Sequence, residues 1–454
     1  MIKRKGFAAV AMVLACVVAP SLKADTLAEA LSAAYNNSGL LEQNRALLRA
    51  ADEGVAQSVA ATLPIINWSV SANRTWVDTP VQTTSDSALA RITGDLTLFD
   101  FGVSQLGIEA QKEVVLGTRQ ALRDLEQNVL YRAVQAYMNV RSAGEFMQLR
   151  QNNVRVITQE FRAAQDRFEV GEVTRTDVAL AEARLAAARS LLAAAQGELA
   201  QSIEEYSVAV GRAPEGLSAV NPAPVSRDLN DAKAFAVRNH PAILEAQHSV
   251  TAAELNIMRA KAATRPSVSL NGFVSTDQDS NTSAQLGVSI GGPIYQGGAI
   301  LSAFREVQAN RDAARSGLHL TTLAIEQQVG NAYALLQVAR ASRQASDQQI
   351  SAAQVAFEGV REEAALGSRT TLDVLNAEQE LLDARANLIA AQSDEVIASY
   401  ALLSAMGLLT ADHLNLLVQQ YDPSAYYNLV KDAPSALSPQ GAALDRVLES
   451  IGKE

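Results

Sequence analysis

Two kinds of hydrophobic spacing alternate along the chain and predict its elements. Between residues 25 and 61, leucine and valine recur at helical spacings, with one break near Asn36 and an end at Pro64. The stretch 66–73 instead alternates apolar and polar residues, which is typical of a strand with one apolar face. The same alternation returns over 88–98. We therefore expect a second strand, antiparallel to the first.

A very long helix follows the second predicted strand. From Gly102 to Phe168 helix formers run unbroken over 67 positions without a proline. At 1.5 Å per residue, this helix would be roughly 100 Å long, too long to bury itself alone. Gly171 interrupts the pattern. A returning helix is predicted to start near Thr176, where Thr176 and Asp177 are suitable capping residues.

The returning helix carries a seven-residue repeat that predicts a coiled-coil seam. Large apolar residues recur every seven positions, each followed three positions later by an alanine. Small residues at every second seam position let neighbouring backbones approach closely. The large positions are Val178, Leu185 and Leu192, and the small ones are Ala181, Ala188 and Ala195.

The whole pattern occurs twice. The segment VGEVTRTDVALA, 170–181, is echoed 196 residues later by LGSRTTLDVLNA, 366–377. A second helix, two alternating strands, a long helix after PIYQGG (293–298) and a return helix follow the same order. Here the helix before the strands is expected over 229–264, with a helix boundary where His240 precedes Pro241.

The domain organisation follows from this duplication. The expected parts are a first repeat, 25–210; a proline-bearing linker, 211–228; a second repeat, 229–407; and a C-terminal segment, 408–454, irregular with short helices.

Composition and charge restrict the possible folds and partners. Residues are 48% hydrophobic but only 5% aromatic, which suits long helices with narrow seams. A net charge of -11 argues against a nucleic-acid partner.

Basic residues before a short apolar run predict a secretory signal peptide over 1–24. Attachment of a lipid at Cys16 is the alternative; cleavage after Ala24 would leave no cysteine and hence no disulfide.

Four strands with one apolar face cannot be stable alone in water, because two edges stay unpaired. Each strand is about 10 to 13 residues, long enough to cross an outer membrane when tilted. Only a closed barrel satisfies the backbone there, so two, three or four copies would be needed. An aromatic girdle at the membrane surface would consist of Trp68, Phe99, Phe101, Phe273 and Tyr295. The alternative is a soluble sandwich, which does not account for such long helices.

The duplicated plan, together with PIYQGG and LGSRTTLDVLNA, resembles the TolC-type outer membrane efflux and export channels over about residues 25–408. The resemblance implies a mainly α fold with a small β part: a homotrimer with a 12-stranded barrel in outer membrane lipid and an α-helical tunnel through the periplasm. The tunnel would be a passive duct without a cofactor. Its partners would be a periplasmic adaptor and an inner-membrane pump or ABC exporter. The strand-to-helix junctions would be Gly102, Gly297 and Gly298.

The resemblance also implies a gate at the periplasmic tip. Gly171 and Gly367 would form the helix turns and the adaptor-docking surface. Asp373 would form a carboxylate ring that selects cations. Arg369 would tie the closed mouth to the neighbouring turn through Thr176 and Asp177.

Two positions depart from the family pattern. Asn376 stands where the family has a second acid, and Ala364 replaces a tyrosine that helps to hold the mouth closed. A simpler interpretation of Asp177 and Asp373 also stays open, since acids favour the first turn of any helix.

Other functional classes find less support. Residues 287–291 read GVSIG and fit the GxSxG pattern of hydrolases, but the strand alternation continues through Ser289 where a nucleophile elbow needs a turn. The four histidines form no HExxH motif, so we expect no enzyme. A structural or adhesive trimeric coiled coil at the cell surface is the remaining alternative. It has no need of the duplicated strand pair.

Overall fold

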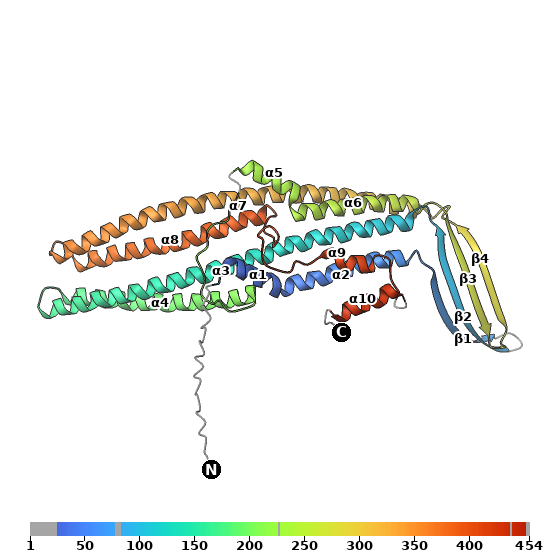
Figure 1. The fold of residues 1–454 in the computed structure, drawn as a ribbon, viewed down its shortest axis with the longest axis horizontal. Coiled ribbons are helices and arrows are strands. Elements are labelled where there is room, and N and C mark those ends of the chain that lie inside the picture. The colour runs from blue at the N-terminus through green and yellow to red at the C-terminus, as the bar shows by residue number, and fades with distance from the viewer. Residues whose placement is uncertain (1–24, 78–82, 226–227, 436–437, 451–454) are drawn as a thin grey trace, which may run out of the picture.

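The computed structural model describes residues 25–77, 83–225, 228–435 and 438–450. The predicted signal peptide, 1–24, and Cys16 lie outside the described residues. The elements form two series of the same order, followed by two short helices (Figure 1). The first series is α1 (Leu27–Asn37), α2 (Gly39–Ala60), β1 (Ile65–Val77), β2 (Thr83–Phe99), α3 (Val103–Glu169) and α4 (Arg175–Val210). The second is α5 (Leu229–Asn239), α6 (Pro241–Ala262), β3 (Ser267–Asp277), β4 (Thr282–Gly291), α7 (Ala299–Ala365) and α8 (Thr371–Ala405), followed by α9 (Pro423–Val430) and α10 (Pro439–Ser450).

The two series match in helix length and differ in the strands. Helices α3 and α7 each have 67 residues and begin 196 residues apart. Helices α1 and α5 have 11 residues each, and α2 and α6 have 22, but these begin 202 residues apart. The difference of six residues therefore falls between α2 and α3, where β1 and β2 are longer than β3 and β4.

The helix before each strand pair is broken near its start. Ser38 ends α1 and caps α2, which confirms the break expected near Asn36. The segment expected as a helix over 229–264 consists of two helices, which meet at the boundary expected at His240: α5 ends there, and His240 caps α6, with Pro241 as its first residue. Proline has no N–H and disfavours helical backbone in the residue before it, so it starts a helix better than it continues one.

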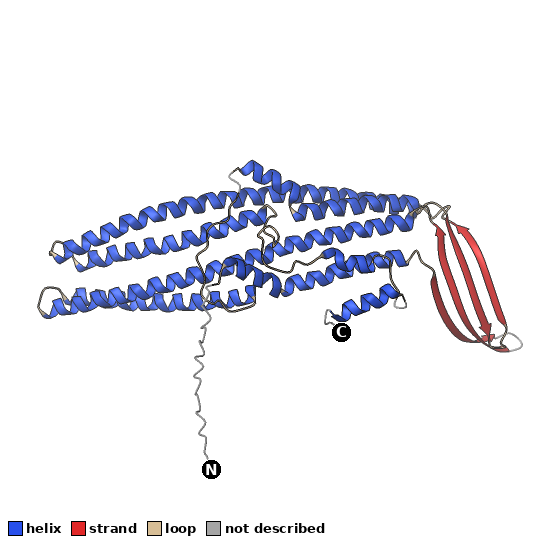
Figure 2. Ribbon diagram, viewed as in Figure 1, coloured by secondary structure: helices blue, strands red, loops and turns tan. Residues whose placement is uncertain are grey.

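The four strands form one antiparallel sheet in the order β1-β2-β3-β4, beyond the end of the helices (Figure 2). The register opposes Trp68 to Ile92, Ile92 to Val274, and Val274 to Ala284, so one face is apolar across all four strands. This face is exposed in the single chain, as shown by Trp68, 80% exposed, and Leu286, 76% exposed. Within the described part of one chain, the outer edges of β1 and β4 have no neighbouring strand.

The main core lies midway along the helices. There α1, α3 and α4 pack with the C-terminal part of α8 and the segments that follow α4 and α8. The buried Tyr137 hydroxyl donates to the carbonyl oxygen of Asp25 at 2.8 Å, and Arg212 pairs with the Asp25 carboxylate at 2.9 Å. Farther along, α9 packs on α2, with the Tyr426 hydroxyl donating to Glu53 at 2.6 Å. The described helices include none that is both long and apolar enough to cross a membrane.

Candidate functional site

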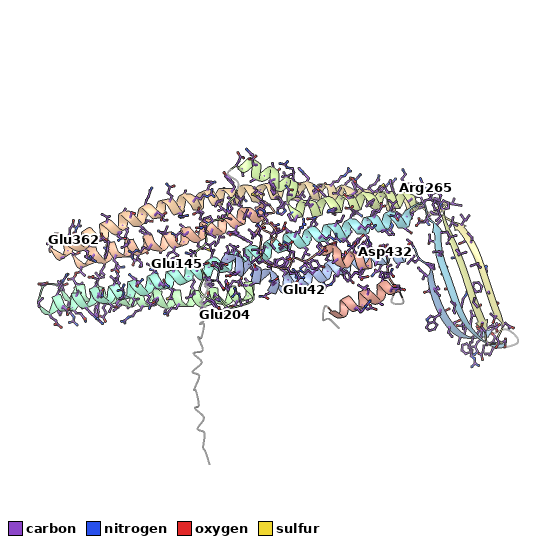
Figure 3. The ribbon with its side chains drawn as sticks, viewed as in Figure 1. Glu42, Glu145, Glu204, Arg265, Glu362 and Asp432 are labelled. Atoms are coloured by element: carbon purple, nitrogen blue, oxygen red, sulfur yellow. The ribbon has the colours of Figure 1, made fainter. Side chains whose placement is uncertain are left out.

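The helices form two long hairpins, α3–α4 and α7–α8, whose turns lie at the end opposite the sheet (Figure 1). Glu362, close to the end of α7, marks this end in Figure 3. Both turns contain a glycine with φ of +81°, Gly171 and Gly367, a left-handed backbone that side chains rarely adopt. The N–H of Gly171 donates to the Phe168 carbonyl at 3.0 Å, and that of Gly367 donates to the Ala364 carbonyl at 3.1 Å. The two turns therefore have the same backbone construction.

Each returning helix then begins with a capping box. Thr174 caps α4 and Thr370 caps α8. The Asp177 carboxylate accepts from the Thr174 N–H and hydroxyl at 2.9 and 2.7 Å, and the Asp373 carboxylate accepts from those of Thr370 at 2.9 and 2.8 Å. The cap expected at Thr176 is corrected, since this residue lies within the first turn of α4.

These bonds favour the ionised acids. The hydroxyl and N–H of Thr174 lower the pKa of Asp177 below its usual value. The N–H and hydroxyl of Thr370 do the same for Asp373, assisted by the charge of Arg369. Both bonds to Asp373 go to Oδ2, so Oδ1 stays available for solvent or a cation. The capping interpretation of the two acids thus holds within one chain, and it leaves a carboxylate oxygen for another role.

The second turn has an ion pair that the first lacks. Arg369 Nε lies 2.8 Å from a carboxylate oxygen of Glu363, which ties the turn to the last residues of α7. At the corresponding positions of the first turn stand Val173 and Arg167, 196 residues earlier. Within the described residues of one chain, Arg369 makes no hydrogen bond to Thr176 or Asp177, which belong to the other hairpin. Glu363 was not among the predicted gate residues.

The two hairpins touch each other just above the turns. Leu375 of α8 packs against Ile157 of α3 and Leu185 of α4. Asn376 accepts a hydrogen bond from Arg184 of α4 at 3.3 Å, so the residue that departs from the family pattern links the two hairpins. Arg184 was also missed, because nothing in the repeat of α4 distinguishes it from a solvated charge.

At the opposite end, glycines and aromatic residues surround the junction of helices and sheet. Gly102 and Gly298 are the N-caps of α3 and α7, with φ of +89° and +90°, and Gly297 precedes the second cap with φ of +60°. The Phe99 and Phe101 rings meet edge to face with centroids 4.7 Å apart. Arg265, labelled in Figure 3, lies over Phe101 at 5.4 Å.

The strand register sorts the aromatic residues by face. Trp68 lies on the apolar face, and Tyr295, after β4, is 85% exposed. Phe273 differs from the expected girdle: its register places it on the polar face, where Arg91 lies 3.7 Å from its ring centroid. Trp76, which is not in the predicted girdle, shares the face of Trp68 and is 73% exposed. Eight residues of strand place these two rings about 26 Å apart, close to the height of an apolar membrane band.

The serine and histidines considered as catalytic candidates make contacts within strands and between helices. Ser289 lies within β4, and its hydroxyl donates to Asn271 at 2.7 Å across the sheet. His240 accepts from the Ala242 N–H as a helix cap, and His248 pairs with Glu113 at 2.7 Å. Among the described residues, no group of three His, Cys, Asp or Glu side chains could hold a metal ion.

Comparison with known proteins agrees with this geometry. The sequence profile of the outer membrane efflux protein family matches residues 30–212 and 235–408. The chain is 37% identical over 419 residues to outer membrane efflux protein BepC of Brucella suis biovar 1 (strain 1330), covering 90% of this chain and 91% of that protein. It is 25% identical to alkaline protease secretion protein AprF of Pseudomonas aeruginosa, over 80% of each chain.

Solved structures share the fold. The crystal structure of CusC matches with a TM-score of 0.76 at 21% identity, covering 84% of this chain and 91% of CusC. The arrangement of two long helical hairpins and a four-stranded sheet is therefore the fold of this channel. The chain belongs to the outer membrane efflux protein family and is an outer membrane channel of an efflux or secretion system.

Proposed function

We propose that three copies of the chain assemble into one channel, with their sheets closed into a barrel of twelve strands in the outer membrane. The observation that carries this proposal is the sheet itself, whose apolar face is exposed and whose outer edges, on β1 and β4, have no neighbouring strand within the described chain. Pairing β4 of one copy with β1 of the next removes every edge and turns the apolar face to lipid. The polar face then lines the lumen.

The hairpins continue the barrel as a tunnel through the periplasm. At about 1.5 Å per residue, α3 and α7 are each roughly 100 Å long. The alanine-rich seams of α4 and α8 are buried within each chain, where α4 packs on α3 and α8 packs on α7. The channel acts as a passive duct without a catalytic step. A periplasmic adaptor docks at the turns around Gly171 and Gly367 and joins the duct to an inner-membrane pump or ABC exporter.

The turns form the gate. With three copies around one axis, Asp373 supplies a ring of carboxylates with Oδ1 available for cations. Arg369 holds the closed turn, through Glu363 in its own chain and through Thr176 and Asp177 of the neighbouring turn. Asn376 leaves a single acidic ring at this level, so we expect weaker cation binding than two adjacent rings would give.

Reconstitution in planar bilayers tests the channel. Purified full-length protein should conduct ions, migrate as a trimer before heating and shift in electrophoretic mobility after boiling. A monomer without conductance would contradict the assembly.

A matched pair of variants tests the ring. Asp373→Asn should raise the concentration of multivalent cation needed to block current from the periplasmic side. Thr370→Ala removes the hydroxyl that donates to the same carboxylate but keeps the negative charge of Asp373, and it serves as the control. Equal effects would assign block to helix capping rather than to the ring.

A further inference from the structure

The contact between the hairpins contains a buried carboxyl group that neither capping nor the carboxylate ring explains. Glu378 of α8 is 7% exposed. Its Oε1 receives one long hydrogen bond, 3.4 Å, from the Asn153 amide of α3, which is 8% exposed. Its Oε2 is inaccessible and has no hydrogen-bond partner. Because the helices of one chain already bury this group, assembly cannot expose it without moving α8 from α3.

The surroundings of Glu378 are apolar or repulsive. The residues one turn away on α8 are buried hydrophobics: Val374, Leu375, Leu381 and Leu382. The nearby charge on α3 is the carboxylate of Glu160, which repels the negative form of Glu378. Burial without a cation destabilises a carboxylate far more than it destabilises a neutral carboxyl group.

The nearby charges on the other helices are engaged elsewhere. Arg184 of α4 donates to Asn376. On α7, Phe357 packs with Leu381; beside it, Glu358 accepts from Gln354 at 3.1 Å, and Arg361 lies over the Phe357 ring at 5.8 Å. Among the described residues, neither of these arginines forms an ion pair with Glu378.

We propose that Glu378 is a pH-sensitive switch for the gate: the protonated side chain lets α8 pack on α3 and keeps the turns closed, and its ionisation opens them. Separation of the hairpins would bring the carboxylate to water, where it releases its proton to the periplasm. This inference rests on the proposed gate. Glu378 lies five residues beyond Asp373, about 7.5 Å along the helix, so movement at this contact is transmitted to the ring.

The direction of the response follows from linkage. Burial, with the charge of Glu160, raises the pKa of Glu378 from 4.5 to about 7. In the separated state the exposed carboxyl group titrates near 4.5. The closed state therefore binds the proton more tightly. The proton's stabilisation of the closed state over the open state is fully present below about pH 4.5 and is lost as pH rises to about 7. Above that value the equilibrium no longer changes. One proton changes the closed-to-open ratio by at most about tenfold per pH unit.

The test records the open fraction of the full-length channel in planar bilayers between pH 4.5 and 8. For the wild type it should rise up to about pH 7 and then stay constant. Glu378→Gln and Glu378→Met, which cannot ionise, should stay at the low open fraction throughout. Glu182→Gln changes the exposed counterpart, 196 residues earlier, and should behave as wild type. Glu160→Gln should keep the response but end it at lower pH, since a repulsive charge is gone.

The outcomes separate this inference from the channel itself. If the wild type conducts but Glu378→Gln and Glu378→Met keep its pH profile, the switch is refuted and the channel stands. A flat wild-type profile between pH 4.5 and 7, or an equal effect of Glu182→Gln, also refutes it. Absence of conductance at every pH contradicts the proposed function instead. Circular dichroism and trimer mobility establish that each variant is folded.

Discussion

The two hairpin turns have the same backbone and differ in what surrounds it. Each has a glycine at φ of +81° and a threonine-aspartate capping box. The second hairpin alone adds Arg369 with Glu363 in the turn, and Glu378 in the contact with the first. The two repeats thus have turns with the same backbone, and the additional side-chain contacts are found on the second hairpin. Variants made at equivalent positions can separate the shared construction from the added function.

The largest difference should come from a buried side chain. Leu375→Ala removes a residue only 2% exposed from the contact between the hairpins, and should cost about 2–5 kcal/mol of unfolding free energy. The counterpart, Ala179, is exposed, so Ala179→Ser should change stability by about 0.5 kcal/mol or less. Guanidinium unfolding followed by circular dichroism measures both. Similar losses would mean that the hairpins are packed alike.

Substitutions of the two turn glycines should instead have equal effects on stability. Gly171→Ala and Gly367→Ala place a side chain in left-handed backbone but meet no atom within 4 Å, so strain is the only cost. We expect about 1–2 kcal/mol for each. The same unfolding experiment measures it, and a clear difference would show that the turns are not interchangeable.

The threonine caps should also be equivalent and slightly weaker in effect. Thr174→Ala and Thr370→Ala each remove a hydroxyl from a capping box, at about 1 kcal/mol. Because the pKa of each aspartate is lowered, the stability from its carboxylate is present above the ordinary value, 3.8, and is lost as pH falls below it. In acid unfolding, the stability difference between each single variant and the wild type should become smaller below that pH, leaving the part due to the aspartate N–H that each threonine hydroxyl accepts. Curves that stay parallel would contradict the assignment.

The exposed ion pair should have the smallest effect on stability and a visible one on the gate. Arg369→Ala and Glu363→Gln break the same pair, whose side chains are half exposed and screened by salt. Both should raise single-channel conductance. Arg369→Ala should do so more if Arg369 also reaches Thr176 and Asp177 of the neighbouring turn. Identical conductances would mean that Arg369 contributes to the gate only through its contact with Glu363 in the same chain.

Much of the fold was predictable because periodicity decides it. The absence of proline over a long stretch predicted α3 within one residue at each end, and period-two alternation located all four strands. The boundary between α5 and α6 was predictable from His240-Pro241, because a proline disfavours helical backbone in the residue before it.

The site was less predictable, since it depends on contacts between distant segments. Capping acids have a local signature, but the partner Thr174 lay two residues before the threonine that was chosen. The face of Phe273 depends on register across two strands. Glu378 adjoins a seam of Val374 and Leu381 and resembles any solvated glutamate until α3 is placed against it.

The equal lengths of α3 and α7 restrict how this chain can change. One residue inserted into either helix would rotate its turn by about 100° and displace it by about 1.5 Å relative to the other. All six residues by which the repeats differ fall in the segment that carries the strands, where a hairpin can lengthen without displacing the gate. Additions that leave the gate intact, such as an epitope or an affinity tag, therefore belong in the strand hairpins and not in the helices.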